Sequence, residues 1–349
     1  MSGKYRAVEA TSPGVLRLVE RRVPEPGPGQ VRLRVQAAGI CHTDALIIEG
    51  HWPNVPYPHV PGHEIAGFID AVGDGVLGWK PGQRVGVGWF GGNCGRCGSC
   101  RRGDLINCVN MIASGVTRDG GYAEVVIAEA RALVAIPDAL APEDAAPLLC
   151  AGVTTYNALR NAKLRAGDLV AVQGIGGLGH LGVQFARGMG FHVVAIARGK
   201  EKEALARRLG SHEYIDSTAE DPAQALLRLG GADAILATAS SGKSMGPLLG
   251  GLASRGKLIV VGVSDEPMEI NITQFLIGSK TIQAEVGGTA IDSEDTLEFS
   301  VLQRIRPVIE RLPLERAPEA YARMMRNEAR FRMVLTFEGA QAPSLNAKR

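Results

Sequence analysis

The chain has 349 residues, with 38 Lys and Arg against 36 Asp and Glu, so its formal net charge is only +2. This balance provides no field of one sign and argues against nucleic acid and membrane surfaces as partners, which leaves a small molecule. The length suffices for about two domains. No stretch approaches the roughly 18 apolar residues of a membrane-spanning helix and the first residues carry no apolar leader, so we expect a cytoplasmic protein.

Residues 4 to about 150 consist of short apolar runs separated by proline and glycine. Turn sequences such as Pro24–Gly29 and Lys80–Gly82 lie between the runs, as expected where a chain reverses direction. Runs of this length and spacing predict a β-rich domain. The expected strands are Val15–Val19, Val31–Val35, Ile65–Val72, Arg84–Val87, Ala123–Ile127 and Ala132–Ile136.

The six cysteines form two groups. Four of them follow the pattern C-x2-C-x2-C-x7-C in a glycine-containing loop, namely Cys94, Cys97, Cys100 and Cys108. Four thiolates complete a tetrahedral coordination sphere, so this loop predicts a structural zinc site. The other two, Cys41 and Cys150, would provide three ligands together with His63 and leave a fourth position open for chemistry. In a chain without an export signal this spacing favours metal ligands over the alternative of core thiols and a disulfide.

From about residue 165 the pattern changes to an alternation of strands and helices, which predicts a parallel sheet with helices on both faces. The expected strands are Leu169–Gln173, His192–Ala197, Ala232–Ala237 and Lys257–Val263, and the expected helices include His180–Met189 and Lys202–Leu209. Beyond about Gly288, helical patterns around Thr296 and Tyr321 precede a strand at Met333–Phe337. We expect this last segment to rejoin the first domain.

A G-x-G-x-x-G sequence follows the first of these strands and opens the next helix. It reads Gly174-Ile175-Gly176-Gly177-Leu178-Gly179. Gly174 permits a tight turn, Gly176 lets the backbone approach a pyrophosphate, and Gly179 lets helix and strand pack closely. The helix N-terminus adds free N–H groups and positive potential. The turn therefore predicts a dinucleotide site.

The second strand of this unit ends at Ala197, where an NAD-selective protein usually carries an acidic residue. Arg198 follows immediately, with Lys200 and Lys202 nearby. A guanidinium group suits a 2′-phosphate, so NADP is favoured over NAD; solvated cations at a helix start are the alternative. We also expect Val261, in the strand Lys257–Val263, to line the cofactor site.

Five motifs in this order resemble the zinc-dependent alcohol dehydrogenases of the medium-chain dehydrogenase/reductase superfamily, over nearly the whole chain. They are Cys41–Asp44, Gly62–Gly67, the four-cysteine loop, Leu148–Thr154 and the glycine-rich turn. The resemblance implies an α/β plus β fold, in which a GroES-like β-rich catalytic domain accompanies a Rossmann domain with a doubly wound parallel sheet. The implied ranges are 1–152 for the catalytic domain with its zinc loop 93–109, 153–287 for the Rossmann domain, and 288–349 for a C-terminal segment that returns to the catalytic domain.

The resemblance further implies two zinc ions per chain. Cys41, His63 and Cys150 would bind the catalytic zinc, while the four clustered cysteines would bind the structural one. Glu64 would lie beside the catalytic metal, and Asp44 would orient the imidazole of His63.

The remaining implied roles concern the proton and the cofactor. Thr43 would take the proton of the alcohol. The residues expected to contact the cofactor outside the glycine-rich turn include His42, Thr154 and Arg332. A surface position is the alternative for His42.

Three positions depart from the family pattern. Leu46 stands where many members have the last histidine of a proton relay, and neither His51 nor Glu49 is placed by the sequence as its replacement. Ala290 stands where many relatives have a cofactor-binding arginine. Ala197, discussed above, is the third.

Two tryptophans, Trp52 and Trp89, match positions that line the substrate pocket in similar proteins. Flat indoles there would favour small or aromatic substrates over bulky secondary ones, whereas packing in the core explains them equally well.

The sequence thus predicts a zinc-dependent, NAD(P)-linked alcohol dehydrogenase or aldehyde reductase that transfers a hydride to or from a primary or small secondary alcohol. We expect a homodimer or homotetramer. One alternative is a zinc-free quinone or enoyl reductase of the same superfamily, and another is a non-enzymatic zinc and nucleotide sensor. The physiological alcohol and the preferred direction stay open.

Overall fold

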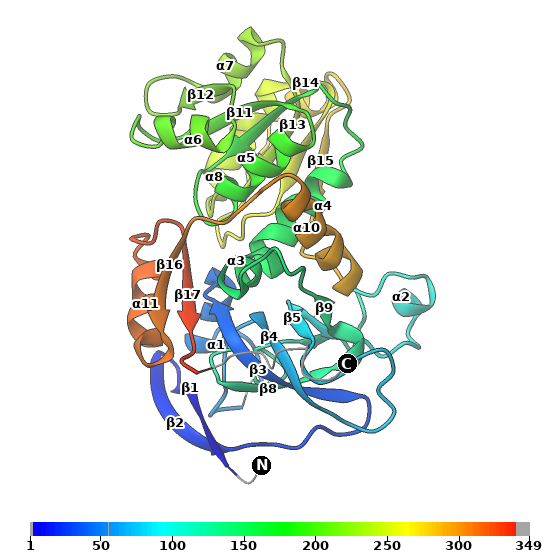
Figure 1. Cartoon of the computed structure of the whole chain (residues 1–349). Coiled ribbons are helices and arrows are strands. Elements are labelled where there is room, and N and C mark those ends of the chain that lie inside the picture. Colours follow the sequence, from blue (N-terminus) through cyan, green and yellow to red (C-terminus); the bar gives the residue numbers. More distant parts are fainter. Residues whose placement is uncertain (1–2, 55, 340–349) are drawn as a thin grey trace. The chain divides into compact units, whose positions relative to one another are not determined.

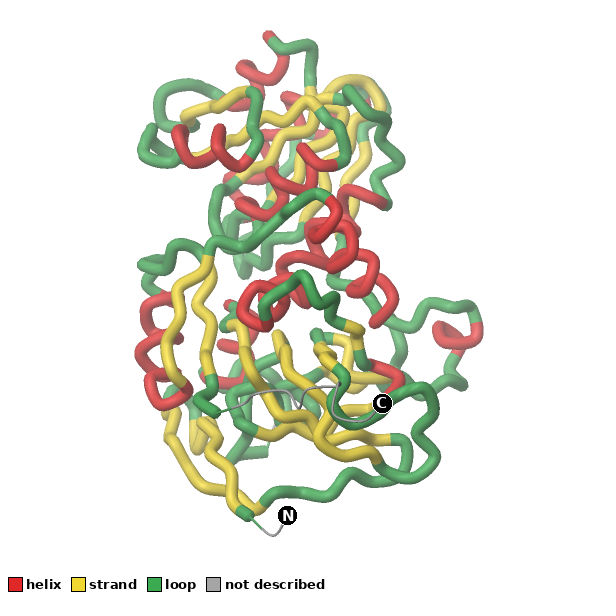
Figure 2. Tube along the Cα trace, in the orientation of Figure 1, coloured by secondary structure: helices red, strands yellow, loops and turns green. Residues whose placement is uncertain are grey.

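The computed structural model describes residues 3–54 and 56–339, which form two compact units (Figures 1 and 2). Within these residues, unit 1 comprises 3–54, 56–150, 288–301 and 307–339, and unit 2 comprises 151–287 and 302–306. Residues 151–152 and 302–306 therefore group with unit 2 and not with the ranges predicted around them. Residues 340–349 of the predicted C-terminal segment lie outside the described residues.

A seven-stranded sheet forms the centre of unit 1, in the order β16-β17-β3-β4-β5-β9 with β8 also paired to β3. The strands of unit 1 are β1 (Lys4–Ser12), β2 (Val15–Arg22), β3 (Gln30–Gly39), β4 (Glu64–Val72), β5 (Arg84–Val87), β6 (Phe90–Gly92), β7 (Ile112–Ala113), β8 (Val125–Glu129), β9 (Val134–Ala135), β16 (Ile309–Pro313) and β17 (Arg332–Thr336). β17 pairs antiparallel with β3 and parallel with β16. The end of the chain therefore contributes two strands to the sheet that the first half builds.

Short helices connect these strands. They are η1 (His42–Asp44), α1 (Ala45–Ile48), α2 (Gly98–Arg101), η2 (Ala130–Ala132), α3 (Pro142–Pro147), α10 (Ala290–Leu302), η5 (Leu314–Arg316) and α11 (Ala317–Met325). The core between them is apolar, with Leu33, Ile65, Ile69 and Met333 all fully buried. Burial of such side chains is the main force that holds a sheet of this kind together.

Unit 2 is a parallel six-stranded sheet in the order β12-β11-β10-β13-β14-β15. Its strands are β10 (Leu169–Gln173), β11 (His192–Ala197), β12 (Glu213–Asp216), β13 (Ala232–Ala237), β14 (Leu252–Val260) and β15 (Thr281–Ala284). Its helices are α4 (Val153–Arg160), α5 (Gly179–Gly188), α6 (Glu203–Leu209), α7 (Pro222–Arg228), α8 (Gly242–Met245), η4 (Gly246–Gly251) and α9 (Ile272–Leu276). This order is that of a dinucleotide-binding doubly wound sheet, with β10 and β13 at the point where the order reverses.

Every strand predicted from the sequence coincides with an observed strand, but several bounds and four longer strands were missed. The missed strands are β1, β12, β15 and β16. Their sequences mix polar or charged residues with apolar ones, because they lie at sheet edges or in a hairpin where one side is exposed.

The predicted strand Lys257–Val263 was wrong at its end, since β14 stops at Val260. There the backbone N–H groups of Val261 and Gly262 both donate to the carbonyl of Ala237 at 3.0 Å, which turns the chain out of the sheet.

Among the described residues, none of the helices combines the length and the apolar composition that crossing a membrane requires.

Candidate metal centres and cofactor turn

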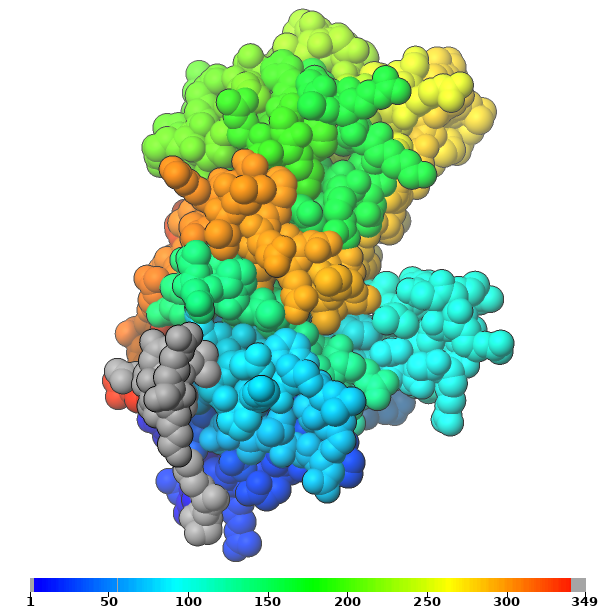
Figure 3. All heavy atoms as spheres, turned by 45° about the vertical axis from the view of Figure 1, so that its right-hand side comes forward, coloured from blue at the N-terminus to red at the C-terminus, as the bar shows by residue number. Residues whose placement is uncertain are grey.

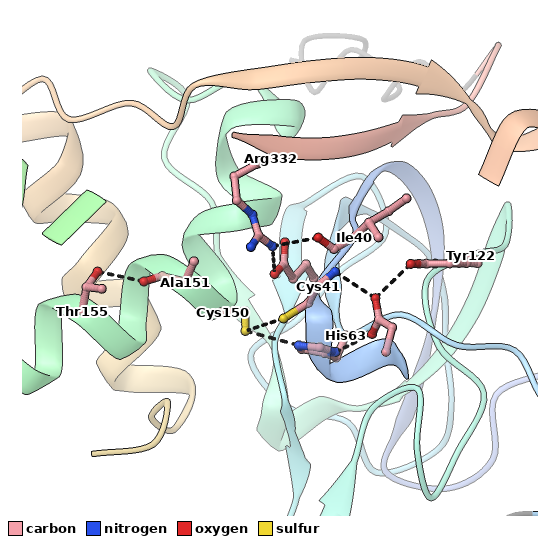
Figure 4. Close-up of polar contacts among 10 residues, drawn as sticks. Ile40, Cys41, His63, Tyr122, Cys150, Ala151, Thr155 and Arg332 are labelled. Carbon is pink, nitrogen blue, oxygen red and sulfur yellow. Dashed lines mark hydrogen bonds and ion pairs between the residues drawn. The ribbon is translucent and has the colours of Figure 1, made fainter. Parts of the chain in front are cut away.

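The donor atoms of the first candidate centre come from three separate segments of unit 1 (Figure 4). Cys41 follows the end of β3, and His63 and Glu64 enter β4, which pairs with β3 so that Gly39 lies opposite Glu64. Cys150 lies in a π-helical turn, Leu148–Gly152, that continues α3. A π-turn widens the helix by one residue and often marks a functional site.

One ligand atom from each of Cys41, His63, Glu64 and Cys150 lies within 4.8 Å of every other. The sulfur atoms of Cys41 and Cys150 are 3.8 Å apart, and His63 Nε2 is 3.2 Å from Cys150 Sγ. A disulfide needs sulfur atoms about 2.05 Å apart, so the thiols are free. Tetrahedral zinc with Zn–S bonds of about 2.3 Å separates two sulfurs by roughly 3.8 Å, so this spacing suits a zinc ion.

Glu64 supplies the clearest sign that a cation belongs here. Its side chain has an exposed fraction of 0%, and its Oε2 atom is buried without a hydrogen-bond partner. The other oxygen, Oε1, is paired with the guanidinium of Arg332, which also donates to the carbonyl of Ile40 at 3.0 Å. A Cβ atom on Gly39 would overlap Glu64 Oε2, so only glycine leaves room for this carboxylate. A buried carboxylate oxygen without a donor requires compensation, which a metal ion would supply.

The hydrogen bond between His63 and Asp44 also favours a metal. Asp44 Oδ1 lies 2.8 Å from His63 Nδ1, so the Nδ1–H of the imidazole is donated to the carboxylate and Nε2 is left to face the two sulfurs. Burial lowers the pKa of His63, but the charges of Asp44 and Cys41 outweigh it and raise that pKa well above its usual value. The hydrogen bond from Cys150 lowers the pKa of Cys41 well below that of an ordinary thiol.

The second candidate centre is the loop around α2, which stands out from the surface of unit 1 (Figure 3, cyan). The sulfur atoms of its cysteines, one each from Cys94, Cys97, Cys100 and Cys108, all lie within 4.8 Å of one another. Pairs among them are separated by 3.5–3.9 Å. Backbone N–H groups point at the sulfurs, and those of Arg96 and Cys97 lower the pKa of Cys94 to about 6. Four converging thiols have the composition of a structural zinc site.

The glycine-rich turn lies between β10 and α5 in unit 2. Gly174 has a φ of +88°, which a residue with a side chain rarely adopts. A Cβ atom on Gly179 would overlap the carbonyl of Gly174, whereas one on Gly176 would meet no atom within 4 Å. Gly174 and Gly179 therefore shape the turn, and the open space at Gly176 is where a pyrophosphate could approach the backbone.

The turn after β11 places Ala197 in the sheet and Arg198 on the surface. Lys202 has a backbone partner, because its Nζ donates to the carbonyl of Ile175 in the glycine-rich turn at 2.9 Å. Lys200 is exposed like Arg198. The exposed cations of this turn are free to face a ligand, while Lys202 joins two turns of the unit.

A carboxylate that the sequence did not single out lies beside this turn. Asp216, at the end of β12, accepts the N–H of Gly199 at 2.8 Å, and Tyr214 donates its hydroxyl to the carbonyl of Gly199 at 2.6 Å. Ala197 and Asp216 lie opposite each other in the parallel register of β11 and β12. The neighbouring strand thus holds the turn from both sides of Gly199.

The surroundings of the other predicted residues are described by their burial and their hydrogen bonds. His42 is exposed, Thr154 is buried in α4, and Val261 is half-buried just beyond β14. The hydroxyl of Thr43 has no hydrogen-bond partner among the residues that the structure describes, and Thr43 sits in η1 two residues after Cys41. Glu49 accepts a hydrogen bond from Tyr321 at 2.8 Å.

Aromatic rings line one side of the Cys41–His63 centre. Trp89 packs edge-on against His63 with ring centroids 5.3 Å apart, and Trp52 packs against Trp89 at 6.3 Å. Trp52 is 36% exposed, so this member of the pair does not lie within the core. The two indoles, inclined at 72° to each other, therefore lead from the partly exposed Trp52 to the ligand His63.

Two contacts at this centre were not predicted from the sequence. Arg332, whose contact with the cofactor stays a prediction, is 7% exposed and pairs with Glu64. Tyr122 was not considered, yet it is fully buried and donates to Asp44 at 2.9 Å. The only sequence signal for Tyr122 is the pair Gly120-Gly121 before it, which marks a close approach of backbones.

Comparison with known proteins places this geometry in a family. Residues 27–138 match the model of the alcohol dehydrogenase GroES-like domain, and residues 177–302 match that of the zinc-binding dehydrogenase domain. The alcohol dehydrogenase patD of Penicillium expansum is 44% identical over 322 residues, which cover 92% of this chain and 94% of that protein. An alcohol dehydrogenase of Geobacillus stearothermophilus is 37% identical, with 92% and 95% coverage.

The fold agrees with solved structures. A cinnamyl alcohol dehydrogenase from Sorghum bicolor superposes with a TM-score of 0.87 at 32% identity, covering 98% of this chain and 99% of that one. The predicted combination of a GroES-like domain and a Rossmann domain is therefore confirmed. The chain belongs to the zinc-type alcohol dehydrogenase family of the medium-chain dehydrogenase/reductase superfamily.

Proposed function

We propose that this alcohol dehydrogenase depends on zinc and uses a nicotinamide cofactor to interconvert alcohols with aldehydes or ketones. The observation that carries the proposal is the convergence of two thiols, one imidazole and a buried, unpartnered carboxylate oxygen within 4.8 Å. A zinc-free reductase of the superfamily would have no use for such a set, and the comparisons do not favour it.

In this proposal Cys41, His63 and Cys150 hold the metal, and three protein ligands leave a position for the substrate oxygen. When bound, zinc acts as a Lewis acid that polarises this oxygen and favours loss of the alcohol proton. Asp44 keeps the imidazole of His63 in the tautomer whose Nε2 faces the metal position. Glu64 would place one carboxylate oxygen within 4.8 Å of the three ligand atoms, where its negative charge would favour a bound cation.

Thr43 is our choice for the group that receives the proton of the alcohol. Its hydroxyl is free of partners among the described residues, and it belongs to the same short helix as the orienting Asp44. Because Leu46 cannot carry a proton and Glu49 is already bound by Tyr321, we propose that the proton leaves Thr43 toward the cofactor ribose or solvent.

Metal analysis combined with activity tests the proposal. The purified wild-type protein should contain two zinc ions per chain and oxidise primary alcohols. Cys41→Ser should retain one zinc, still bind the dinucleotide and lose roughly a thousandfold or more in turnover, because a Lewis acid supplies several kcal/mol of transition-state stabilisation. Cys97→Ser is the matched control, since it also loses one thiolate but from the closed cluster. Wild-type protein without alcohol oxidation would instead indicate a sensor.

For the cofactor we propose NADP over NAD. The support is the exposed Arg198 directly after Ala197, which occupies the position where NAD-selective proteins usually carry an acidic residue. Asp216 is the nearest carboxylate in register, and one of its oxygens is already bound to Gly199 and Thr218.

Initial rates at equal, low cofactor concentration provide the test. NADPH should support faster aldehyde reduction than NADH, and Arg198→Ser should reduce that preference about tenfold or more, because a hydrogen bond to a charged group contributes about 1.5–3 kcal/mol. Arg208→Ser, which removes an exposed arginine of α6, should leave the preference unchanged. A wild-type preference for NADH would refute the assignment.

For the substrate we propose small or flat primary alcohols and their aldehydes. The support is the pair Trp52–Trp89 beside His63, because flat aromatic rings pack favourably against planar apolar groups. Trp89→Ala should raise activity on branched secondary alcohols relative to aromatic primary ones, measured as the ratio of kcat/KM values.

We also propose that two chains associate through the free edge of the unit 2 sheet. β15 is the last strand on that side, and apolar side chains nearby are unusually exposed. These are Val263 at 71%, Ile272 at 59%, Leu276 at 68%, Ile277 at 69% and Val286 at 68%. Such a patch beside an edge strand favours association with a second copy. The six cysteines form no disulfide, and we propose on this ground that the protein works in the reducing cytoplasm.

A further inference from the structure

We propose that Tyr122 is a positioning residue of the catalytic zinc site, acting through Asp44 and through the backbone that leads into His63. The inference rests on the proposed zinc site and adds a residue that does not touch the metal position. Tyr122 lies in the segment before β8, and its side chain forms one end of the network drawn in Figure 4. Its exposed fraction is 0%, so its hydroxyl has no access to water.

The hydroxyl of Tyr122 completes the set of donors around Asp44. Asp44 Oδ2 accepts this hydroxyl at 2.9 Å and the backbone N–H of Cys41 at 3.0 Å, while Oδ1 accepts the imidazole of His63 at 2.8 Å. With donors on both oxygens, the carboxylate cannot rotate without losing at least one hydrogen bond. The phenol therefore fixes the plane of the carboxylate, and the carboxylate fixes the ring of the ligand.

The backbone provides a second, independent connection. Residues 120–122 run beside residues 60–62, and three N–H groups of the first segment donate to carbonyls of the second at 2.7–3.0 Å. The ring of Tyr122 also fills the space beside Gly62, where an added Cβ atom would lie 2.5 Å from its Cδ1. The residue just before His63 is thus held between a phenol ring and a hydrogen-bonded strand-like segment.

One substitution separates these two connections. Tyr122→Phe keeps the ring against Gly62 and removes only the hydroxyl, so the protein should fold while Asp44 Oδ2 keeps the single donor from Cys41. Removing a group that orients a ligand typically weakens metal binding 10- to 100-fold. Because Tyr122 is one step farther from the metal than Asp44, we expect about a tenfold loss of affinity for zinc at this site.

The experiment measures zinc affinity of the full chain by competition with a chromophoric chelator, without reference to activity. The four-cysteine site should keep its zinc affinity in every variant and therefore serves as an internal reference. The Cys41→Ser protein, whose remaining zinc is the structural one, identifies the part of the titration curve that belongs to this site. Tyr321→Phe is the matched control, since Tyr321 is also buried and also donates its hydroxyl to a carboxylate, Glu49, at 2.8 Å.

The expected result is a tenfold weaker catalytic site in Tyr122→Phe and an unchanged one in Tyr321→Phe. In an Asp44→Ala background, Tyr122→Phe should change the affinity by less than about twofold, because the carboxylate that it acts through is gone. Equal affinity in wild type and Tyr122→Phe, or the same loss in both backgrounds, would overturn the role of Tyr122. Absence of zinc from the wild-type protein would instead refute the proposed function.

Discussion

The buried pair of Arg332 and Glu64 provides the sharpest stability prediction for unit 1. Arg332 is 7% exposed and Glu64 is 0% exposed, so neither charge is hydrated when its partner is removed. In Arg332→Met the carboxylate loses its ion pair while its second oxygen already lacks a hydrogen-bond partner. Removing one member of a buried pair typically costs about 3–5 kcal/mol.

This magnitude converts into a measurable shift of the melting temperature. For a unit of 150–250 residues each kcal/mol lowers Tm by about 2–4 °C, so Arg332→Met should melt roughly 6–20 °C below wild type at neutral pH. Arg316→Met is the matched control, because Arg316 pairs with Glu319 on the surface, where both side chains are about half exposed. Exposed pairs contribute at most about 1 kcal/mol, so the control should melt within a few degrees of wild type.

The pH dependence has a defined sign. Burial raises the pKa of Glu64 to about 7 against the opposing charge of Arg332, and loss of the arginine should raise it further. A carboxyl group whose folded-state pKa lies above its unfolded value loses stability as pH rises through the folded pKa. The deficit of Arg332→Met should therefore grow above about pH 7, and be smallest in mild acid.

Two outcomes would refute this reasoning. One is a shift of Arg332→Met no larger than that of Arg316→Met. The other is a double variant, Arg332→Met with Glu64→Gln, that costs the sum of its two single variants, because two residues that act as a pair must be strongly non-additive.

Three further predictions address other parts of the chain. Cys100→Ser should lower Tm and remove one zinc per chain, with kcat changed less than about twofold, because a closed four-thiolate site has no open position; unchanged melting with loss of turnover would contradict it. Burial lowers the pKa of His59, so stability should fall as pH drops below about 6.5, where the unfolded chain binds the proton more readily; His59→Gln should flatten the Tm profile between about pH 7 and 5, and an unchanged profile would count against it. Leu276→Asp should convert a dimer to a monomer in light scattering, whereas Leu227→Asp, on α7, should not.

Local patterns in the sequence predicted much of the fold. The strands β10, β11 and β13 match their predicted bounds, since continuous apolar runs between turn residues have few alternatives. Helix α6 ends at Gly210 as predicted, because Gly210 adopts a φ of +115° that continues no helix. The edge strands β12, β15 and β16 escaped prediction because their stability comes from a neighbouring strand and not from their own composition.

The candidate site divides in the same way. The ligand types and the glycine-rich turn could be identified from spacing, and the structure brings Cys41, His63, Glu64 and Cys150 within reach of one cation. Spacing could not predict the ion pair of Arg332 with Glu64, which forms where β17 pairs with β3.

The sequence by itself determined the chemistry available to this protein: six thiols at metal-binding intervals, a turn shaped for a pyrophosphate, and a cation where NAD-selective proteins have an acid. Only the tertiary structure decided which distant groups meet. Tyr122, Asp44 and His63 form one network, and Glu64 keeps a buried oxygen without a partner, because strands far apart in the chain pair with each other. Residue types fix what a site can do, whereas contacts between remote segments depend on how all the apolar faces are buried at once.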